Sequence, residues 1–155
     1  MKYLIYLTGP IGNCSYAKAT TWRDQFTAML AGYNAKCISP MRGKEYLAAE
    51  TSIDSVEYTT PSSCPKGVYT RDRWDSMRCH LMVANLLETE KVSIGTMIEW
   101  AWANSKGTPT IVVTEKDDAH NHILVRGGPG FRVTTLEEAA NLAVAILALE
   151  ESNGR

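Results

Sequence analysis

The chain has 155 residues, of which 45% are hydrophobic and 21% charged, proportions typical of a globular protein with its own core. Its net charge of −1 offers no positive field to a nucleic acid polymer, and its apolar runs are too short to cross a bilayer. We therefore expect one domain over residues 1–155, with neither a polymeric nucleic acid nor a membrane as partner.

The first part of the chain predicts a strand, a helix and a second strand. Residues 3–8 (YLIYLT) form a continuous apolar run that ends at Gly9, which is typical of a buried strand. Ser15 is the expected cap of a helix, and residues 35–39 (AKCIS) form the next strand. One face of that helix is lined by Trp22, Phe26 and Leu30.

The regular pattern lapses from about residue 40 to residue 67. This segment contains three prolines, the polar run TTPSSCPKG and only a short helical pattern around KEYLAAE. Irregular segments of this length in compact domains are usually functional or mobile. We therefore expect a long loop over the site at about 40–67.

Strands and helices alternate again in the second half of the chain. The patterns predict a helix over 69–79, a strand over 81–87 and a helix over 96–106, followed by a strand over 108–113. After the Gly-rich turn at 126–130, a short strand over 131–134 leads to a last helix. Thr135 and Glu138 are spaced as a capping box at the start of that helix.

Apolar strands joined by helices indicate parallel β-α-β units with right-handed crossovers. The predicted fold is an α/β three-layer sandwich with a mostly parallel sheet of about five strands, similar to flavodoxin or Rossmann folds. Ligands of such sheets bind beyond the carboxyl ends of the strands. The segments to consider are therefore 8–15, 39–44 and 85–99.

Several common site signatures are missing from the sequence. There is no G-x-x-x-x-G-K-[ST], no G-x-G-x-x-G after the first strand and no G-x-S-x-G. The four cysteines form no C-x-x-C pair, and the three histidines provide only one H-x-H. We expect reduced cysteines in a cytoplasmic protein, with no metal and no cofactor.

Glu99 is a carboxylate within the apolar run SIGTMIEWAWA, near the start of a predicted helix. The helix dipole favours a negative charge there, so we expect Glu99 to be ionised and available for catalysis. A second interpretation is equally open, because Thr96 and Glu99 have the T-x-x-E spacing of a capping box.

Asp72 and Asp75 share a face of the preceding helix, and one of them can project over the cleft. The alternative is a solvated face on which these aspartates pair with nearby arginines. A solvated surface is also the expectation for most of the basic residues of this region, Lys44 included. Arg42 is the exception, because it follows a strand end and can reach a base or a phosphate. Tyr6 is either a core aromatic or the hydrogen-bond donor to a carboxylate at the strand edge.

Four stretches together resemble the nucleoside 2-deoxyribosyltransferase family, which includes 2'-deoxynucleoside 5'-monophosphate N-glycosidases. They are IYLTGP, SPMRGKEYLA, the helix with Asp72, and SIGTMIEWAWA, and the similarity extends over about residues 3–147. The resemblance implies that Glu99 is the nucleophile, that Asp72 binds the base and transfers its proton, and that Tyr6 positions Glu99. The substrate-binding candidates at the same strand edge are Gly9, Arg42, Asn85, Ser93 and Gly95.

Two positions differ from the common pattern of that family. Ser93 stands where many deoxyribosyltransferases have an Asp that can bond the 5'-hydroxyl, whereas the monophosphate N-glycosidases resemble this chain in having Ser. His80 stands where the family commonly has Asp, and we interpret it as a packed structural residue.

The resemblance implies an enzyme that exchanges the base of 2'-deoxynucleosides through a covalent glycosyl-Glu99 intermediate. The alternative is a hydrolase that cleaves deoxynucleoside 5'-monophosphates, and a non-catalytic nucleotide-binding module ranks third. The expected partners are a nucleoside or nucleotide and a free nucleobase. A homo-oligomer is also implied, in which the segment 120–132 (HNHILVRGGPGFR) of a neighbouring subunit completes the pocket.

Overall fold

The computed structural model describes residues 2–54, 58–115, 119–128 and 130–152. Five parallel strands form one sheet in the order β2-β1-β3-β4-β5. The strands are β1 (Tyr3–Thr8), β2 (Ala35–Ile38), β3 (Leu81–Asn85), β4 (Thr110–Val113) and β5 (Phe131–Val133). The predicted α/β fold with a parallel five-stranded sheet is therefore confirmed.

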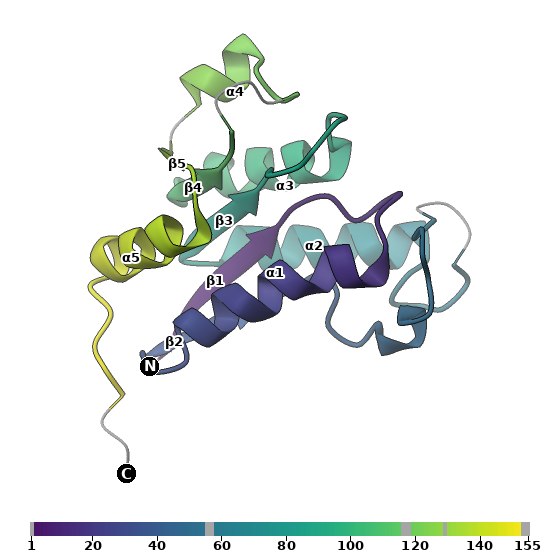
Figure 1. The fold of residues 1–155 in the computed structure, drawn as a ribbon, viewed down its shortest axis with the longest axis horizontal. Helices are drawn as coiled ribbons and strands as arrows, with labels where there is room; N and C mark the ends of the chain where they lie inside the picture. Colours follow the sequence, from purple (N-terminus) through teal and green to yellow (C-terminus); the bar gives the residue numbers. More distant parts are fainter. Residues whose placement is uncertain (1, 55–57, 116–118, 129, 153–155) are drawn as a thin grey trace.

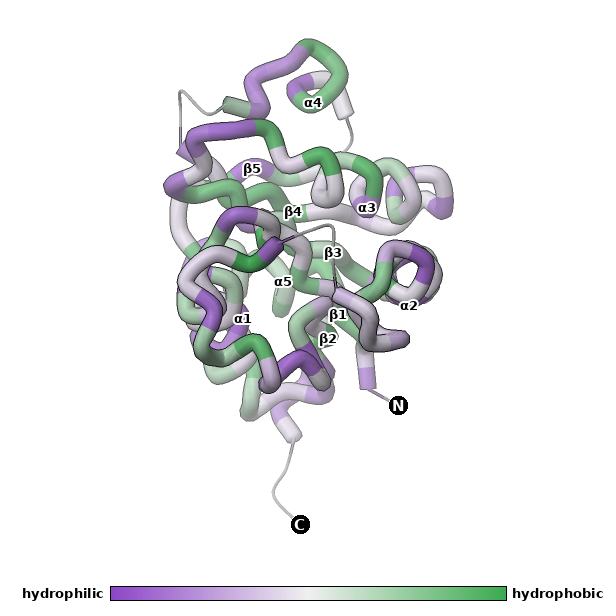
Figure 2. The backbone as a smooth tube through the Cα atoms, turned by 90° about the vertical axis from the view of Figure 1, so that its right-hand side faces the viewer, coloured by the Kyte–Doolittle hydropathy of each residue, from purple (hydrophilic) through white to green (hydrophobic). Residues whose placement is uncertain are grey.

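Helices cover both faces of the sheet, as Figures 1 and 2 show. One face carries α1 (Tyr16–Met29) and α5 (Leu136–Leu147), which pack on side chains such as Ile5 and Leu7 of β1. The other face carries α2 (Pro65–Arg78) and α3 (Ile94–Ser105), which pack on the opposite side of the strands. Successive side chains of a strand point to opposite faces, so Tyr6 and Thr8 of β1 face α2 and α3.

Helix starts differ most from the predicted boundaries. α2 begins at Pro65, four residues before the predicted start, because Cys64 caps the helix and Pro65 takes its first position. α3 begins at Ile94 because Ser93 is its cap, with the Ser93 hydroxyl accepting a hydrogen bond from the backbone N–H of Thr96. The interpretation of Thr96 as the cap of this helix is therefore wrong. The capping box of Thr135 and Glu138 is confirmed at the start of α5.

Two short elements complete the fold. A 3-10 helix, η1 (Glu45–Leu47), occupies the predicted helical pattern in the long loop. The five-residue helix α4 (Ile123–Gly127) was not predicted, and it stands out from the sheet in Figure 1. Pro129, in the predicted Gly-rich turn, lies outside the described residues. Within the part of the chain that the structure describes, no helix has the length and hydrophobicity to cross a bilayer.

The order of the strands reverses between β1 and β3, because the chain adds β2 on one side of β1 and β3 on the other. The connections leaving β1 and β3 diverge there, which opens a crevice at the carboxyl ends of the strands. The long loop approaches the same edge, where its residues Met41, Leu47 and Ile53 form a small apolar cluster with Ala19 of α1.

Candidate active site

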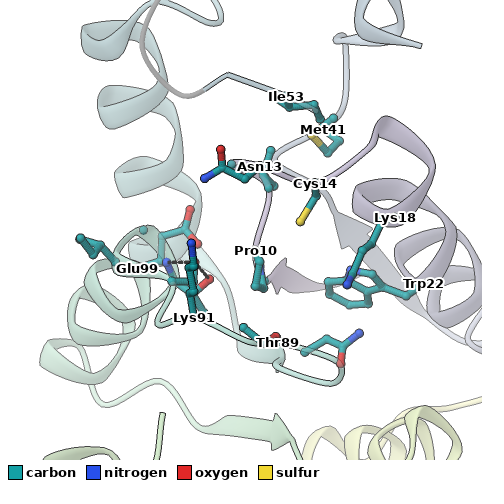
Figure 3. A pocket seen from close by; sticks show the side chains of 18 of the residues that line it. Pro10, Asn13, Cys14, Lys18, Trp22, Met41, Ile53, Thr89, Lys91 and Glu99 are labelled. Carbon is teal, nitrogen blue, oxygen red and sulfur yellow. Dashed lines mark hydrogen bonds between the residues drawn. The ribbon is translucent and has the colours of Figure 1, made fainter. Parts of the chain in front are cut away.

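A pocket of about 1030 Å³ lies at the carboxyl edge of the sheet, where the crevice is expected. The loops after β1 and β3, the start of α3, one face of α1 and the long loop all contribute to its lining. Figure 3 shows Glu99 on one side of this pocket and Lys18 and Trp22 of α1 on the other, with Pro10 between them. Asp72 of α2 lines the same pocket.

Glu99 lies in the second turn of α3, rather than in the first turn, and it does not cap the helix. Both of its carboxylate oxygens are held by hydroxyl groups of β1. The Tyr6 hydroxyl donates to Oε1 at 2.8 Å, and the Thr8 hydroxyl donates to Oε2. The Glu99 side chain is therefore fixed at the pocket wall, with only 8% of the residue exposed.

Burial and, to a smaller extent, the nearby charge of Asp72 raise the pKa of Glu99 from 4.5 to about 7. The hydrogen bonds from Thr8 and Tyr6, and the cation of Arg23, act in the opposite direction. The expectation of a permanently ionised Glu99 therefore needs correction, because at neutral pH this carboxyl divides between its two protonation states.

Arg23 of α1 is a buried cation at the end of β1, and no sequence pattern identified it. Its guanidinium donates to the carbonyl oxygens of Leu7 at 3.2 Å and Gly9 at 3.0 Å, and also to that of Ala19. These bonds fix the end of β1, next to the hydroxyls that hold Glu99. Burial lowers the pKa of Arg23 to about 10, so the residue remains a cation at neutral pH.

Asp72 and Asp75 are both buried, so their interpretation as a solvated face is wrong, whereas the expected pairing with arginines is present, with Arg71 at 3.4 Å from Asp72 and Arg78 at 2.8 Å from Asp75. Burial raises the pKa of Asp72, while the cations of Arg71 and Lys44 lower it. Asp75 does not line the pocket, and its carboxylate pairs with Arg42 at 2.5 Å and with Arg78 at 2.8 Å. The structure therefore gives the two aspartates different surroundings, and only Asp72 lines the pocket.

Four of the five predicted substrate-binding residues line the pocket: Gly9, Asn85, Ser93 and Gly95. Arg42 is not among the lining residues, since its guanidinium is engaged by Asp75 and by the carbonyl of Ser39.

The lining residues differ in how much room they leave. A Cβ atom added to Gly9 would lie 2.8 Å from the carbonyl oxygen of Asn85, so the close approach of the two loops requires glycine. Nothing lies within 4 Å of a Cβ atom added to Gly95, so this position leaves room. Ser93 donates its backbone N–H to Nε2 of His120 at 2.8 Å, which fixes the start of α3.

His80 is exposed rather than packed, and its contacts hold the start of the sheet. Its Nδ1 accepts the backbone N–H of Leu4 at 3.0 Å, and its ring lies edge-on to Tyr3.

Thr8 and Lys44 were missed as individual site residues. Both lie in the segments 8–15 and 39–44, which follow the carboxyl ends of predicted strands. Only the bond of Thr8 to Glu99 and the burial of Lys44 in the pocket wall distinguish them from their neighbours. No cluster of His, Cys, Asp and Glu side chains in the described ranges has the geometry of a metal site.

Comparisons with known proteins relate the chain to solved structures. No protein-family model matches the sequence, and no curated protein matches it. The structure of the CMP N-glycosidase BcmB from Clostridium botulinum is 15% identical, with a TM-score of 0.57, and the match covers 92% of this chain and 98% of that one. The 2-deoxyribosyltransferase from Leishmania mexicana is 13% identical, with a TM-score of 0.59, over 93% and 97% of the two chains.

A third similar structure is the Moco carrier protein from Chlamydomonas reinhardtii. It is 16% identical, with a TM-score of 0.62, and the match covers 96% of this chain and 99% of that one. At these identities the likeness shows a shared fold, and proteins with the same fold can differ in their chemistry.

Proposed function

We propose that the chain is a nucleoside 2-deoxyribosyltransferase that exchanges the base of 2'-deoxynucleosides. The observation that carries this proposal is the buried carboxylate of Glu99, held on both oxygens by Tyr6 and Thr8, in a pocket that also contains Asp72. A fixed carboxylate with its partner carboxyl nearby is the arrangement that retaining glycosyl transfer requires. The shared fold with a 2-deoxyribosyltransferase supports the same activity.

In the first half of the proposed reaction, an oxygen of ionised Glu99 attacks C1' of the deoxyribose. The bond from C1' to the base nitrogen breaks, and its electron pair stays with the base, which receives the proton of Asp72. The products are a free base and a glycosyl ester of Glu99. In the second half, a different base attacks C1' and returns its proton to Asp72, while the ester bond electrons return to Glu99.

Burial raises the pKa of both carboxyls, so the pair can hold one proton near neutral pH. Burial raises the pKa of Asp72, which favours a carboxyl that can hold a proton for the leaving base. Tyr6 and Thr8 orient the nucleophile, and Arg23 supplies a positive charge that favours its ionised form. Activity therefore requires one proton on the pair, placed on Asp72.

A deoxynucleoside 5'-monophosphate N-glycosidase is the second candidate, and Ser93 is the observation that favours it. Ser93 lines the pocket at the start of α3, where a hydroxyl does not repel a phosphate as an Asp would. Lys18 and Lys91 line the same pocket, and a CMP N-glycosidase shares the fold. In this reaction water replaces the second base, so the sugar phosphate is released.

One experiment separates these two candidates. Wild-type protein is incubated with deoxyinosine plus adenine, and separately with single deoxynucleoside 5'-monophosphates. Formation of deoxyadenosine supports the transferase, whereas base release from monophosphates alone supports the glycosidase. Both require Glu99, so mass spectrometry of quenched reactions should find a deoxyribosyl or phosphodeoxyribosyl adduct on Glu99. Full activity of Glu99→Ala would contradict both.

A binding module without turnover is the remaining alternative, and the shared fold with a Moco carrier protein is what favours it. It predicts that wild-type protein binds its ligand but forms no product. It also predicts that Glu99→Ala binds equally well. Calorimetry on the same two proteins used for the kinetic assay distinguishes it from the enzymes.

A further inference from the structure

Lys44 is a buried lysine in the wall of the pocket. It belongs to the long loop, only 6% of it is exposed, and it lines the same pocket as Asp72 and Glu99. The ion pairs between described residues of this region join Arg71 to Asp72, and Arg42 and Arg78 to Asp75, and Lys44 is in none of them. Burying an ammonium group is costly, so its position at a ligand pocket calls for a function.

The backbone around Lys44 is held firmly in place. The N–H of Lys44 donates to the carbonyl of Met41 at 3.1 Å, and its own carbonyl accepts from Leu47 at 2.9 Å. Two bonds from Arg71 of α2, to the carbonyls of Pro40 and Arg42, attach this part of the loop to the helix that carries Asp72. The loop therefore presents Lys44 at a fixed place beside the proposed proton donor.

The charges around Lys44 come from two helices and its own loop. Burial lowers the pKa of Lys44 and Arg71 lowers it further, while Asp72, Tyr46 and Glu99 raise it. Lys44 thus lies within the electrostatic reach of both proposed catalytic carboxyls. A substrate bound to Glu99 through its sugar and to Asp72 through its base would bring its base to Lys44.

We propose that Lys44 donates a hydrogen bond to an oxo group of the nucleobase, so that the enzyme prefers bases such as hypoxanthine and discriminates against adenine. This inference rests on the proposed function and names its substrate class. An ammonium group has three donors and no acceptor, so it matches a carbonyl oxygen. Adenine has an amino group where hypoxanthine has its oxo group, and two donors would face each other there.

The same contact assists the chemical step. As the bond from C1' to the base nitrogen breaks, its electron pair moves into the ring and part of the negative charge reaches the oxo oxygen. Lys44 stabilises that charge, while the ring nitrogen receives the proton of Asp72. A fixed donor placed where charge develops accelerates the reaction more than it tightens binding.

The test compares deoxyinosine with deoxyadenosine, which differ in the oxo or amino group at position 6 of the purine and in the hydrogen that N1 carries only in deoxyinosine. The variants are Lys44→Met, which keeps the length of the side chain, and Lys44→Gln, which keeps a donor. Lys66→Met, an exposed lysine on α2 outside the pocket lining, is the matched control.

Wild-type protein should favour deoxyinosine in kcat/KM. Lys44→Met should lose about 10²-fold for deoxyinosine but less than about threefold for deoxyadenosine. Lys44→Gln should recover part of the loss, and Lys66→Met should behave as wild type. An equal loss for both nucleosides in Lys44→Met would overturn the proposal, since Lys44 would then act only through Asp72. A wild-type preference for deoxyadenosine would overturn it too.

Failure of the proposed function gives a different result, namely no turnover of any deoxynucleoside or deoxynucleotide by wild-type protein. Calorimetry with free hypoxanthine and free adenine then tests Lys44 directly. Tighter binding of hypoxanthine that weakens about tenfold in Lys44→Met supports the recognition of an oxo base. Equal affinities for the two bases, or no effect of the substitution, contradict it.

Discussion

At the scale of single residues, the Glu99 carboxyl combines strict positioning with a pKa near neutrality. Its two oxygens accept bonds from Tyr6 and Thr8, and burial is the main reason that its pKa reaches about 7. Asp72 adds to this shift, so the state of one carboxyl depends on the other. This dependence leads to two predictions.

The first prediction concerns the pH dependence of turnover. The proposed activity requires one proton on the pair of Glu99 and Asp72, so kcat/KM of the wild type should be bell-shaped, with its alkaline limb near pH 7, where the pair loses that proton. In Asp72→Asn the charge that raises the pKa of Glu99 is gone and only the ionisation of Glu99 remains, so the residual activity should rise with pH through a single limb below pH 7. Turnover should also fall by about 10²-fold. An alkaline limb near pH 7 that persists in Asp72→Asn would show that the two groups are not coupled.

The second prediction concerns stability. The pKa of Glu99 is higher in the folded state than its ordinary value of 4.5, so the folded state binds this proton more tightly. The stabilising effect is fully present below pH 4.5 and is lost as the pH rises to about 7. Glu99→Gln, which carries no charge, should therefore be more stable than wild type at pH 8 by up to about 3 kcal/mol.

Urea unfolding at pH 8 and pH 4.5 measures this difference. The two proteins should have similar free energies of unfolding at the lower pH, because wild-type Glu99 is protonated there in the folded state. Equal stabilities at both pH values would contradict the raised pKa.

At the scale of elements, the site depends on how β1 ends. The alternation of side chains along the strand sends Ile5 and Leu7 into one core and Tyr6 and Thr8 toward α3, so two hydroxyls reach Glu99 from a single strand. Gly9 then allows the chain to pass close to the end of β3. The carbonyls of Leu7 and Gly9 are fixed by Arg23 of α1, so three elements converge at this point.

The third prediction tests that close approach. In Gly9→Ala, the added Cβ would lie 2.8 Å from the Asn85 carbonyl and 3.1 Å from the Trp22 ring. We expect a loss of about 1–3 kcal/mol in the free energy of unfolding, measured in urea, together with reduced activity. Gly32→Ala is the matched control, because nothing lies within 4 Å of its added Cβ. Equal stabilities of the two variants would contradict the steric requirement at Gly9.

At the scale of the whole molecule, apolar side chains remain exposed at α4. Ile123 is 68% exposed and Leu124 is 77% exposed, on a helix that stands out from the sheet in Figure 1. Exposed apolar groups of this kind are typical of contact surfaces. They lie in the segment 120–132, which the family resemblance implies as the contribution of a neighbouring subunit, and homo-oligomerisation remains a prediction.

The fourth prediction tests this expectation. Wild-type protein should sediment as a multimer of the 17.1 kDa chain, and the double variant Ile123→Asp with Leu124→Asp should sediment as a monomer with lower turnover. Leu124→Met, which keeps an apolar side chain, should leave the mass unchanged. Circular dichroism of all three proteins checks that the fold is retained. A monomeric wild type with full turnover would refute the prediction.

The sequence by itself determined the order of the five strands and the four long helices along the chain, the parallel sheet and the sheet edge at which the pocket lies. Local periodicity and capping carry this information, as the bonds of Thr135 and Glu138 at the start of α5 illustrate. The resemblance to deoxyribosyltransferases also selected Tyr6, Asp72 and Glu99, and the fold brings the hydroxyl of Tyr6 to Glu99 and places Asp72 in the same pocket.

Only the tertiary structure decided which polar side chains are buried and where they point. Lys44 and Asp75 look like surface charges in sequence, yet segments distant along the chain bury both of them, and Arg42 turns to Asp75 instead of the pocket. The spacing of Thr96 and Glu99 suggested a capping box, but Ser93 caps α3 and Glu99 bonds to Tyr6 of β1 instead. Burial and pairing depend on neighbours far apart in sequence, which a local pattern does not contain.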